Sequence, residues 1–131
     1  MRVLALDYGS ARIGCAISDP SGTIVRPLSV VEPPDPAAVA ELVAENEAEE
    51  VVLGLPLSLS GSEGEQAERT RRFGEELERV LDVPVRTYDE RLTTRMAEAS
   101  RRTGADAPED ALAAAHLLEG YLASRGEVGD R

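Results

Sequence analysis

The chain has 131 residues, of which 30% are charged and 42% are hydrophobic, an ordinary composition for one folded domain. Acidic residues outnumber basic ones 25 to 14, so the formal net charge is −11 and non-specific attraction to nucleic acid is disfavoured. A single cysteine excludes an intrachain disulfide, and no apolar run approaches the roughly 20 residues of a membrane span, so we expect a cytoplasmic protein without membrane contacts.

Three apolar runs near the N-terminus predict three strands. They cover residues 2–7, 12–18 and 23–31. The gaps between them, 8–11 and 19–22, contain glycine, serine and other turn-forming residues, which favours antiparallel hairpins.

Helices and strands then alternate along the chain. A helix is expected to begin at Pro36, because Asp35 is a good N-cap residue and proline is tolerated at the first helical position. Residues 51–56 predict a short buried strand. The Ser-x-x-Glu sequence at 62–65 predicts a capping box at the start of a second helix. Residues 83–88 predict a last strand.

Two further helices complete the expected order. A short one begins at Thr93 or Thr94 and ends at Gly104, and the final one begins at 106–109. The order βββαβαβαα predicts an α/β fold, a mixed sheet covered by helices. We expect one domain over residues 1–123 and a flexible tail over 124–131.

The negative charge is unevenly distributed. Residues 32–50 hold seven acids and no base, whereas residues 1–31 and 83–107 each have a net charge of +1. The excess acid therefore lies away from the two segments that carry most of the candidate site residues.

Three carboxylates fall at the ends of predicted elements. Asp7 ends the first strand, Glu90 follows the last strand, and Asp110 lies in the first turn of the final helix. If these elements are neighbours, the carboxylates converge and repel one another unless protons or cations compensate. Two Mg²⁺ ions would bring +4 against the −3 of the three acids, which would let an acidic protein bind an anionic phosphodiester.

Each acid also has a simpler structural explanation. Asp7 can accept backbone N–H bonds in the turn that follows it, and Asp110 can stabilise a helix N-terminus. Glu90 can pair with Arg91 on the surface, where such pairs contribute little. The spacing alone favours these explanations, and only the three acids together make a metal site a competing hypothesis.

Four segments carry a family resemblance. They are Asp7 to Asp19 (DYGSARIGCAISD), Val52 to Arg69, Asp89 to Thr94 (DERLTT), and Asp110 with the helix that follows it to Leu122. Together they resemble the motifs of the YqgF/RuvX family, proposed pre-16S rRNA nucleases that are also called Holliday-junction-resolvase-like. The resemblance runs from about residue 2 to residue 122. It implies an RNase H-like fold, a five-stranded mixed sheet whose first three strands are antiparallel.

The resemblance also implies a metal-dependent nuclease. Asp7, Glu90 and Asp110 fall on the catalytic, metal-binding positions, with Asp7 bridging two divalent cations, Mg²⁺ or Mn²⁺. Such a pair of ions activates water and stabilises the leaving oxygen. The expected reaction is 5′-end processing of pre-16S rRNA, and ribosomal precursor particles are a further expected partner.

Three residues are the expected substrate contacts. Gly9 would let the backbone approach a phosphate closely, and Arg12 and Arg91 would bind phosphate, with a structural ion pair as the alternative for each arginine. Asp89 is the less favoured metal ligand. The chain departs from the family at 10–11, where Ser-Ala replaces a frequent Thr-Lys, and at 58–60, where Ser-Leu-Ser replaces a frequent Asn-Met-Asp. These departures remove expected substrate contacts and leave the three acids in place.

Three other functions remain open. A resolvase of branched DNA would need the same acids and metals. A non-catalytic ribosome-assembly factor would keep the fold but gain nothing from clustered carboxylates. An ATPase of the actin or sugar-kinase type would need two lobes, and this chain supplies one. The sequence does not decide between a monomer and a homodimer.

Overall fold

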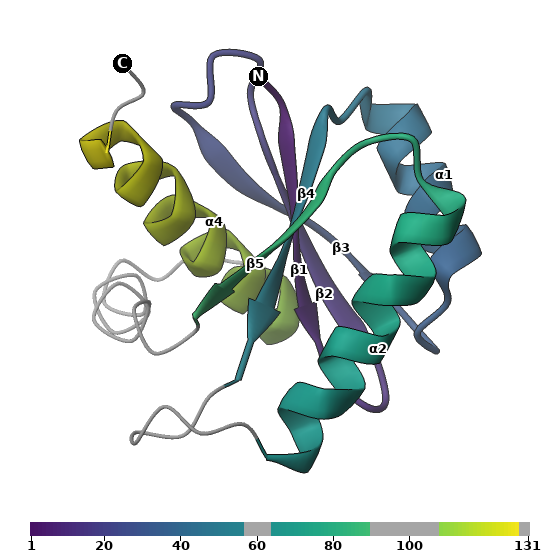
Figure 1. The fold of residues 1–131 in the computed structure, drawn as a ribbon. Coiled ribbons are helices and arrows are strands. Elements are labelled where there is room, and N and C mark those ends of the chain that lie inside the picture. Colours follow the sequence, from purple (N-terminus) through teal and green to yellow (C-terminus); the bar gives the residue numbers. More distant parts are fainter. Residues whose placement is uncertain (57–63, 90–107, 129–131) are drawn as a thin grey trace.

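The structure, a computed structural model, describes residues 1–56, 64–89 and 108–128. In chain order, its elements are β1 (Val3–Tyr8), β2 (Ile13–Ser18), β3 (Val25–Val31), α1 (Pro36–Asn46), β4 (Glu50–Leu55), α2 (Glu65–Val80), β5 (Val85–Asp89) and α4 (Glu109–Val128) (Figure 1). The predicted order is confirmed for these elements. The short helix predicted after Thr93 lies outside the described residues.

The five strands form one mixed sheet in the order β3-β2-β1-β4-β5. β2 pairs antiparallel with both β1 and β3, whereas β4 pairs parallel with both β1 and β5. The predicted α/β fold with an antiparallel start is therefore confirmed. Among the described residues, no helix is long and apolar enough to cross a membrane.

Helices cover both faces of this sheet, with α1 and α2 on one side and α4 on the other (Figure 1). Alternate residues of β1 enter the two cores. Leu4 and Leu6 belong to the core beneath α1 and α2, and Val3 and Ala5 belong to the core beneath α4. Because side chains alternate along a strand, Asp7 projects to the α4 face and Tyr8 projects to the α2 face.

The two helices on the α2 face begin differently. α1 starts at Pro36 as predicted, and the Asp35 carboxylate accepts a hydrogen bond from the Ala37 N–H at 3.1 Å. α2 starts at Glu65 with Gly64 as its N-cap residue. The predicted capping box is wrong, because it requires its glutamate at the third helical position, and Glu65 occupies the first.

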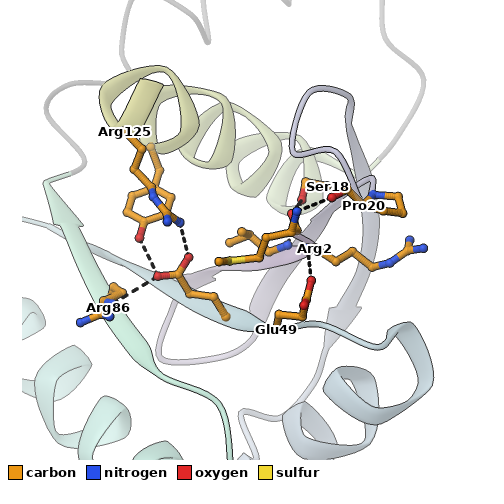
Figure 2. A network of polar contacts seen from close by, with 10 residues as sticks. Arg2, Ser18, Pro20, Glu49, Arg86 and Arg125 are labelled. Atoms are coloured by element: carbon orange, nitrogen blue, oxygen red, sulfur yellow. Dashed lines mark hydrogen bonds and ion pairs between the residues drawn. The ribbon is translucent and has the colours of Figure 1, made fainter. Parts of the chain in front are cut away.

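A buried carboxylate fastens the C-terminal half of α4 to the sheet. The Glu50 side chain, only 4% exposed, accepts hydrogen bonds from Arg86 Nε at 3.2 Å, from the Tyr121 hydroxyl at 2.9 Å and from Arg125. Figure 2 shows Arg86 and Arg125 converging on this carboxylate from β5 and α4. α4 continues to Val128, into the segment 124–131 for which a flexible tail is predicted.

Candidate active site

Gly14 lets the first turn of α4, which carries Asp110, lie next to the end of β1, which carries Asp7. Asp7 is half-buried near the end of β1, and its partner in β2 is Gly14. Residues that face each other across an antiparallel pair project to the same face of the sheet. A Cβ atom at Gly14 would lie 1.9 Å from the Asp110 carbonyl oxygen and 2.4 Å from its carbonyl carbon. The first turn of α4 therefore rests on Gly14, directly beside Asp7.

Small residues allow this close approach along the whole contact. The sheet offers Ala5 and Ala16, and α4 offers Ala111 and Ala114; all four are at most 1% exposed. Because alanine side chains are short, the helix and sheet backbones can approach closely here. The register of β1 against β2 therefore positions Asp7, and the docking of α4 positions Asp110.

Arg12 partly compensates the negative charge of Asp110. Its guanidinium lies 3.5 Å from the Asp110 carboxylate and 3.7 Å from the Glu32 carboxylate. The ion pair considered as an alternative role for Arg12 is therefore present. All three side chains are about half exposed, and exposed ion pairs contribute only about 0–1 kcal/mol. Arg12 can consequently exchange a carboxylate for a phosphate at little cost.

Gly9 has a structural reason to be glycine. Its N–H donates to the Arg12 carbonyl oxygen at 2.9 Å, and a Cβ atom would lie 3.0 Å from that oxygen. The tight turn between β1 and β2 therefore already favours a residue without a side chain. The predicted contact of Gly9 with a phosphate stays a prediction.

The end of β5 lies at the same edge of the sheet, because β1, β4 and β5 are parallel. Tyr88 packs on the α4 face, with its ring 5.7 Å from that of Tyr121. Asp89 is therefore on the opposite face from Asp7, and its ranking as the less favoured ligand stays a prediction. β5 ends immediately before Glu90; Glu90 and Arg91 lie outside the described residues.

The chemistry of the two described acids suits a hard cation. Carboxylate oxygens are the ligands that Mg²⁺ and Mn²⁺ prefer. Over residues 1–56, 64–89 and 108–128, no group of three histidine, cysteine or acidic side chains is arranged to hold a metal. Asp7 and Asp110 lie on either side of Gly14 at one edge of the sheet, and their role as metal ligands stays a prediction.

Known proteins resemble this chain over nearly its whole length. Residues 1–124 match the family described as "RuvX: Holliday junction resolvase". The chain belongs to this family. It is 44% identical to the "Putative pre-16S rRNA nuclease" of Caldanaerobacter subterraneus subsp. tengcongensis, over 95% of this chain and 98% of that protein. It is 46% identical to the protein of the same name from Anaeromyxobacter sp., with the same coverage.

The fold of this RuvX-family chain is also found among solved structures. T. thermophilus RuvC in complex with Holliday junction substrate superposes with a TM-score of 0.69 at 16% identity, over 98% of this chain and 97% of that one. The predicted family and the RNase H-like fold are thereby confirmed.

The residue that sequence reasoning missed in this RuvX-family site is Gly14. It had no assigned role, although a glycine inside a predicted strand often marks a place where another backbone approaches closely. A glycine inside the predicted strand therefore indicates a close approach, but nothing in the sequence identifies the first turn of α4 as the segment that approaches it.

Proposed function

We propose that this RuvX-family protein is a metal-dependent endonuclease that cleaves phosphodiester bonds in nucleic acid, with 5′-end processing of pre-16S rRNA as its main reaction. The observation that carries the proposal is the contact of the Asp110 backbone with Gly14, beside Asp7. The family match and the names of the two bacterial relatives support the choice of reaction. We place this reaction in the cytoplasm, on pre-rRNA or ribosomal precursor particles.

Asp7, Asp110 and Glu90 would hold two divalent cations, Mg²⁺ or Mn²⁺, with Asp7 shared between them. When bound, such ions lower the pKa of a water nucleophile and stabilise the charge on the leaving oxygen. Asp7 and Asp110 contribute negatively charged oxygens from a strand and a helix that pack against each other. Glu90 would contribute from the residue that follows β5.

Arg12 has a defined part in this proposal. Its guanidinium and a cation compete for the same Asp110 carboxylate, since like charges repel and both are attracted to that oxygen. With Asp110 neutralised, Arg12 can turn to a phosphate of the substrate, where its planar guanidinium forms bidentate hydrogen bonds. The arginine thus compensates the acid before substrate binds and contacts substrate afterwards.

Cleavage of branched DNA is the second candidate function. The family description names the Holliday junction, and the same carboxylates would serve both reactions. A stem of pre-16S rRNA with its 5′ extension and a four-way DNA junction should be compared under identical conditions, in Mg²⁺ and in Mn²⁺. Faster cleavage of the junction than of the RNA would favour the second function.

The acids are tested with Asp7→Asn, which keeps the shape of the side chain and removes its charge. We expect this variant to fold and to lose both cleavage and Mn²⁺ binding by calorimetry. Asp82→Asn, an exposed carboxylate between α2 and β5, is the matched control and should behave as wild type. Cleavage by Asp7→Asn at the wild-type rate would contradict the carboxylate mechanism, and failure of the wild type to cleave either substrate would favour the assembly-factor alternative.

A further inference from the structure

A small open pocket lies on the other side of the same sheet edge. It has a volume of about 170 Å³ and is lined by Tyr8, Arg69, Arg72, Phe73 and Glu76. Tyr8 directly follows Asp7 in β1, and its side chain projects to the α2 face. The pocket and the two acids are therefore separated only by the end of one strand.

Two aromatic rings form the apolar wall of this pocket. The centroids of the Tyr8 and Phe73 rings are 4.9 Å apart, with an interplanar angle of 32°. Phe73 is only 5% exposed, whereas Tyr8 remains partly exposed. The Gln66 side-chain amide donates to the Tyr8 carbonyl oxygen at 3.4 Å and connects the start of α2 to the end of β1. Tyr8 is thus supported by Phe73 on the core side and remains partly exposed.

Two arginines and one acid, Glu76, from α2 form the charged wall, so its side chains carry a net positive charge. Arg69 is half exposed and pairs with Glu65 one turn earlier at 2.9 Å. Arg72 is exposed and makes no ion pair with any residue in the described parts of the chain. In a protein with a net charge of −11, an exposed guanidinium without a carboxylate partner among those residues, placed beside an aromatic ring, indicates a site for an anion that carries a flat ring.

We propose that this pocket binds an unpaired nucleotide of the substrate next to the cleaved phosphodiester. Tyr8 stacks on its base, and Arg72, assisted by Arg69, binds its phosphate. Stacking on an aromatic side chain requires a base that is not paired, so the pocket selects a single-stranded segment. This inference rests on the proposed nuclease function and adds to it the path of the substrate strand, from the α4 face across the end of β1 to the α2 face.

The proposed path crosses the short turn after β1. It contains only residues 9–12 between the two strands and is closed by the bond from the Gly9 N–H to the Arg12 carbonyl oxygen. Arg12 then lies on the α4 side of the edge, beside Asp110, and Arg72 lies on the α2 side. The proposed path therefore has one arginine on each side of the sheet edge.

The test measures binding of a fluorescent single-stranded RNA of about 10 nucleotides by anisotropy, with Ca²⁺ in place of Mg²⁺, over a range of salt concentrations. We expect Arg72→Gln to weaken binding about fivefold and to reduce the slope of log Kd against log salt by about 0.7, the loss of one phosphate contact. Tyr8→Leu should weaken binding about tenfold without changing that slope, and Tyr8→Phe should bind as wild type. The matched control is Arg79→Gln, an exposed arginine in the last turn of α2, which should leave both quantities unchanged.

Equal affinities and salt slopes for Arg72→Gln and Arg79→Gln would overturn the inference. Because Arg72 is exposed, its variant will fold even if Tyr8→Leu does not, and thermal denaturation identifies the latter case. Cleavage by the wild type together with unchanged RNA binding by Arg72→Gln would refute the pocket and leave the nuclease intact. RNA binding that depends on Arg72, without cleavage in Mg²⁺ or Mn²⁺, would refute the nuclease and leave the pocket.

Discussion

Replacing Gly14 with alanine adds one methyl group at the contact between β2 and α4. Its Cβ atom would lie 1.9 Å from the Asp110 carbonyl oxygen, whereas ordinary van der Waals contact begins at 3.4 Å. The difference, 3.4 − 1.9 = 1.5 Å, must come from movement of backbone, because the obstructing atoms are a peptide carbonyl and not a flexible side chain. The first turn of α4 must therefore move away from the sheet by about this distance.

The energetic cost depends on the contacts between α4 and the sheet that this movement breaks. Overpacking of a core typically costs about 1–3 kcal/mol, and here the shift also opens a gap beneath Ala111 and Ala114, which loses dispersion contacts. We expect the free energy of unfolding to fall by about 3 kcal/mol, which lowers the melting temperature by roughly 10 °C in a domain of this size. A displacement of about 1 Å at a reacting group can cost a factor of 100 in rate, so cleavage should fall by at least that factor.

Urea and thermal denaturation followed by circular dichroism measure the first effect, and the cleavage assay measures the second. Gly64→Ala is the matched control, because a Cβ atom there has no neighbour within 4 Å. It should cost less than about 1 kcal/mol, the scale of an N-cap substitution. A Gly14→Ala variant with the stability of the control would refute the close approach of Asp110 to β2. A destabilised variant with full activity would instead refute a role for Asp110 in the chemistry.

Three further predictions concern single side chains. Glu50→Gln removes the buried charge on which three donors converge and should lower the free energy of unfolding, measured in urea, by about 2 kcal/mol. An unchanged midpoint of urea unfolding would mean that these hydrogen bonds and ion pairs add no stability. Burial raises the pKa of the Cys15 thiol from 9.0 to about 12, so stability that is present below pH 9 is lost as the pH rises toward 12. Cys15→Ala should flatten this part of the plot of unfolding free energy against pH. An unchanged slope between pH 9 and 12 would contradict burial of the thiol as the cause. Hydrogen bonds from Ser21 and from the backbone hold the pKa of Asp19 below its usual 3.8, so stability present above that pH is lost on acidification, and Asp19→Asn should reduce the loss seen by acid titration.

β1 and β4 were predictable because burial on both faces leaves a local signature. Residues 3–6 and 50–55 are all buried between helices, and such strands appear in the sequence as nearly continuous apolar runs. The start of α1 was predictable for a similar reason, since the Asp35 cap acts within two residues of itself. Local interactions of this kind can be identified without knowledge of the rest of the molecule.

Two features that the sequence did not predict depend on contacts between distant parts of the chain. The residues after Ala123 contain glycine and charged side chains, which favours a tail, yet Arg125 in that segment pairs with Glu50 across 75 positions. The contact of Gly14 with Asp110 is equally remote, and nothing near either residue indicates the other. The capping-box prediction is wrong for a local reason, because α2 begins at Glu65, two residues later than a capping box at 62–65 requires.

The two acids depend on different parts of the fold, and this affects how the site tolerates change. Asp7 is positioned by hydrogen bonding of β1 to both of its neighbours, so its place is secure as long as the sheet forms. Asp110 is positioned by a helix of 20 residues that is fastened near its far end by Glu50 and at its near end by contact with Gly14. A helix rises about 1.5 Å per residue, so these two attachments are roughly 20 Å apart and a small tilt at one end displaces the other. If the proposed function holds, substitutions around Glu50, distant from the sheet edge that carries Asp7, should therefore reduce cleavage through Asp110 while leaving the environment of Asp7 unchanged.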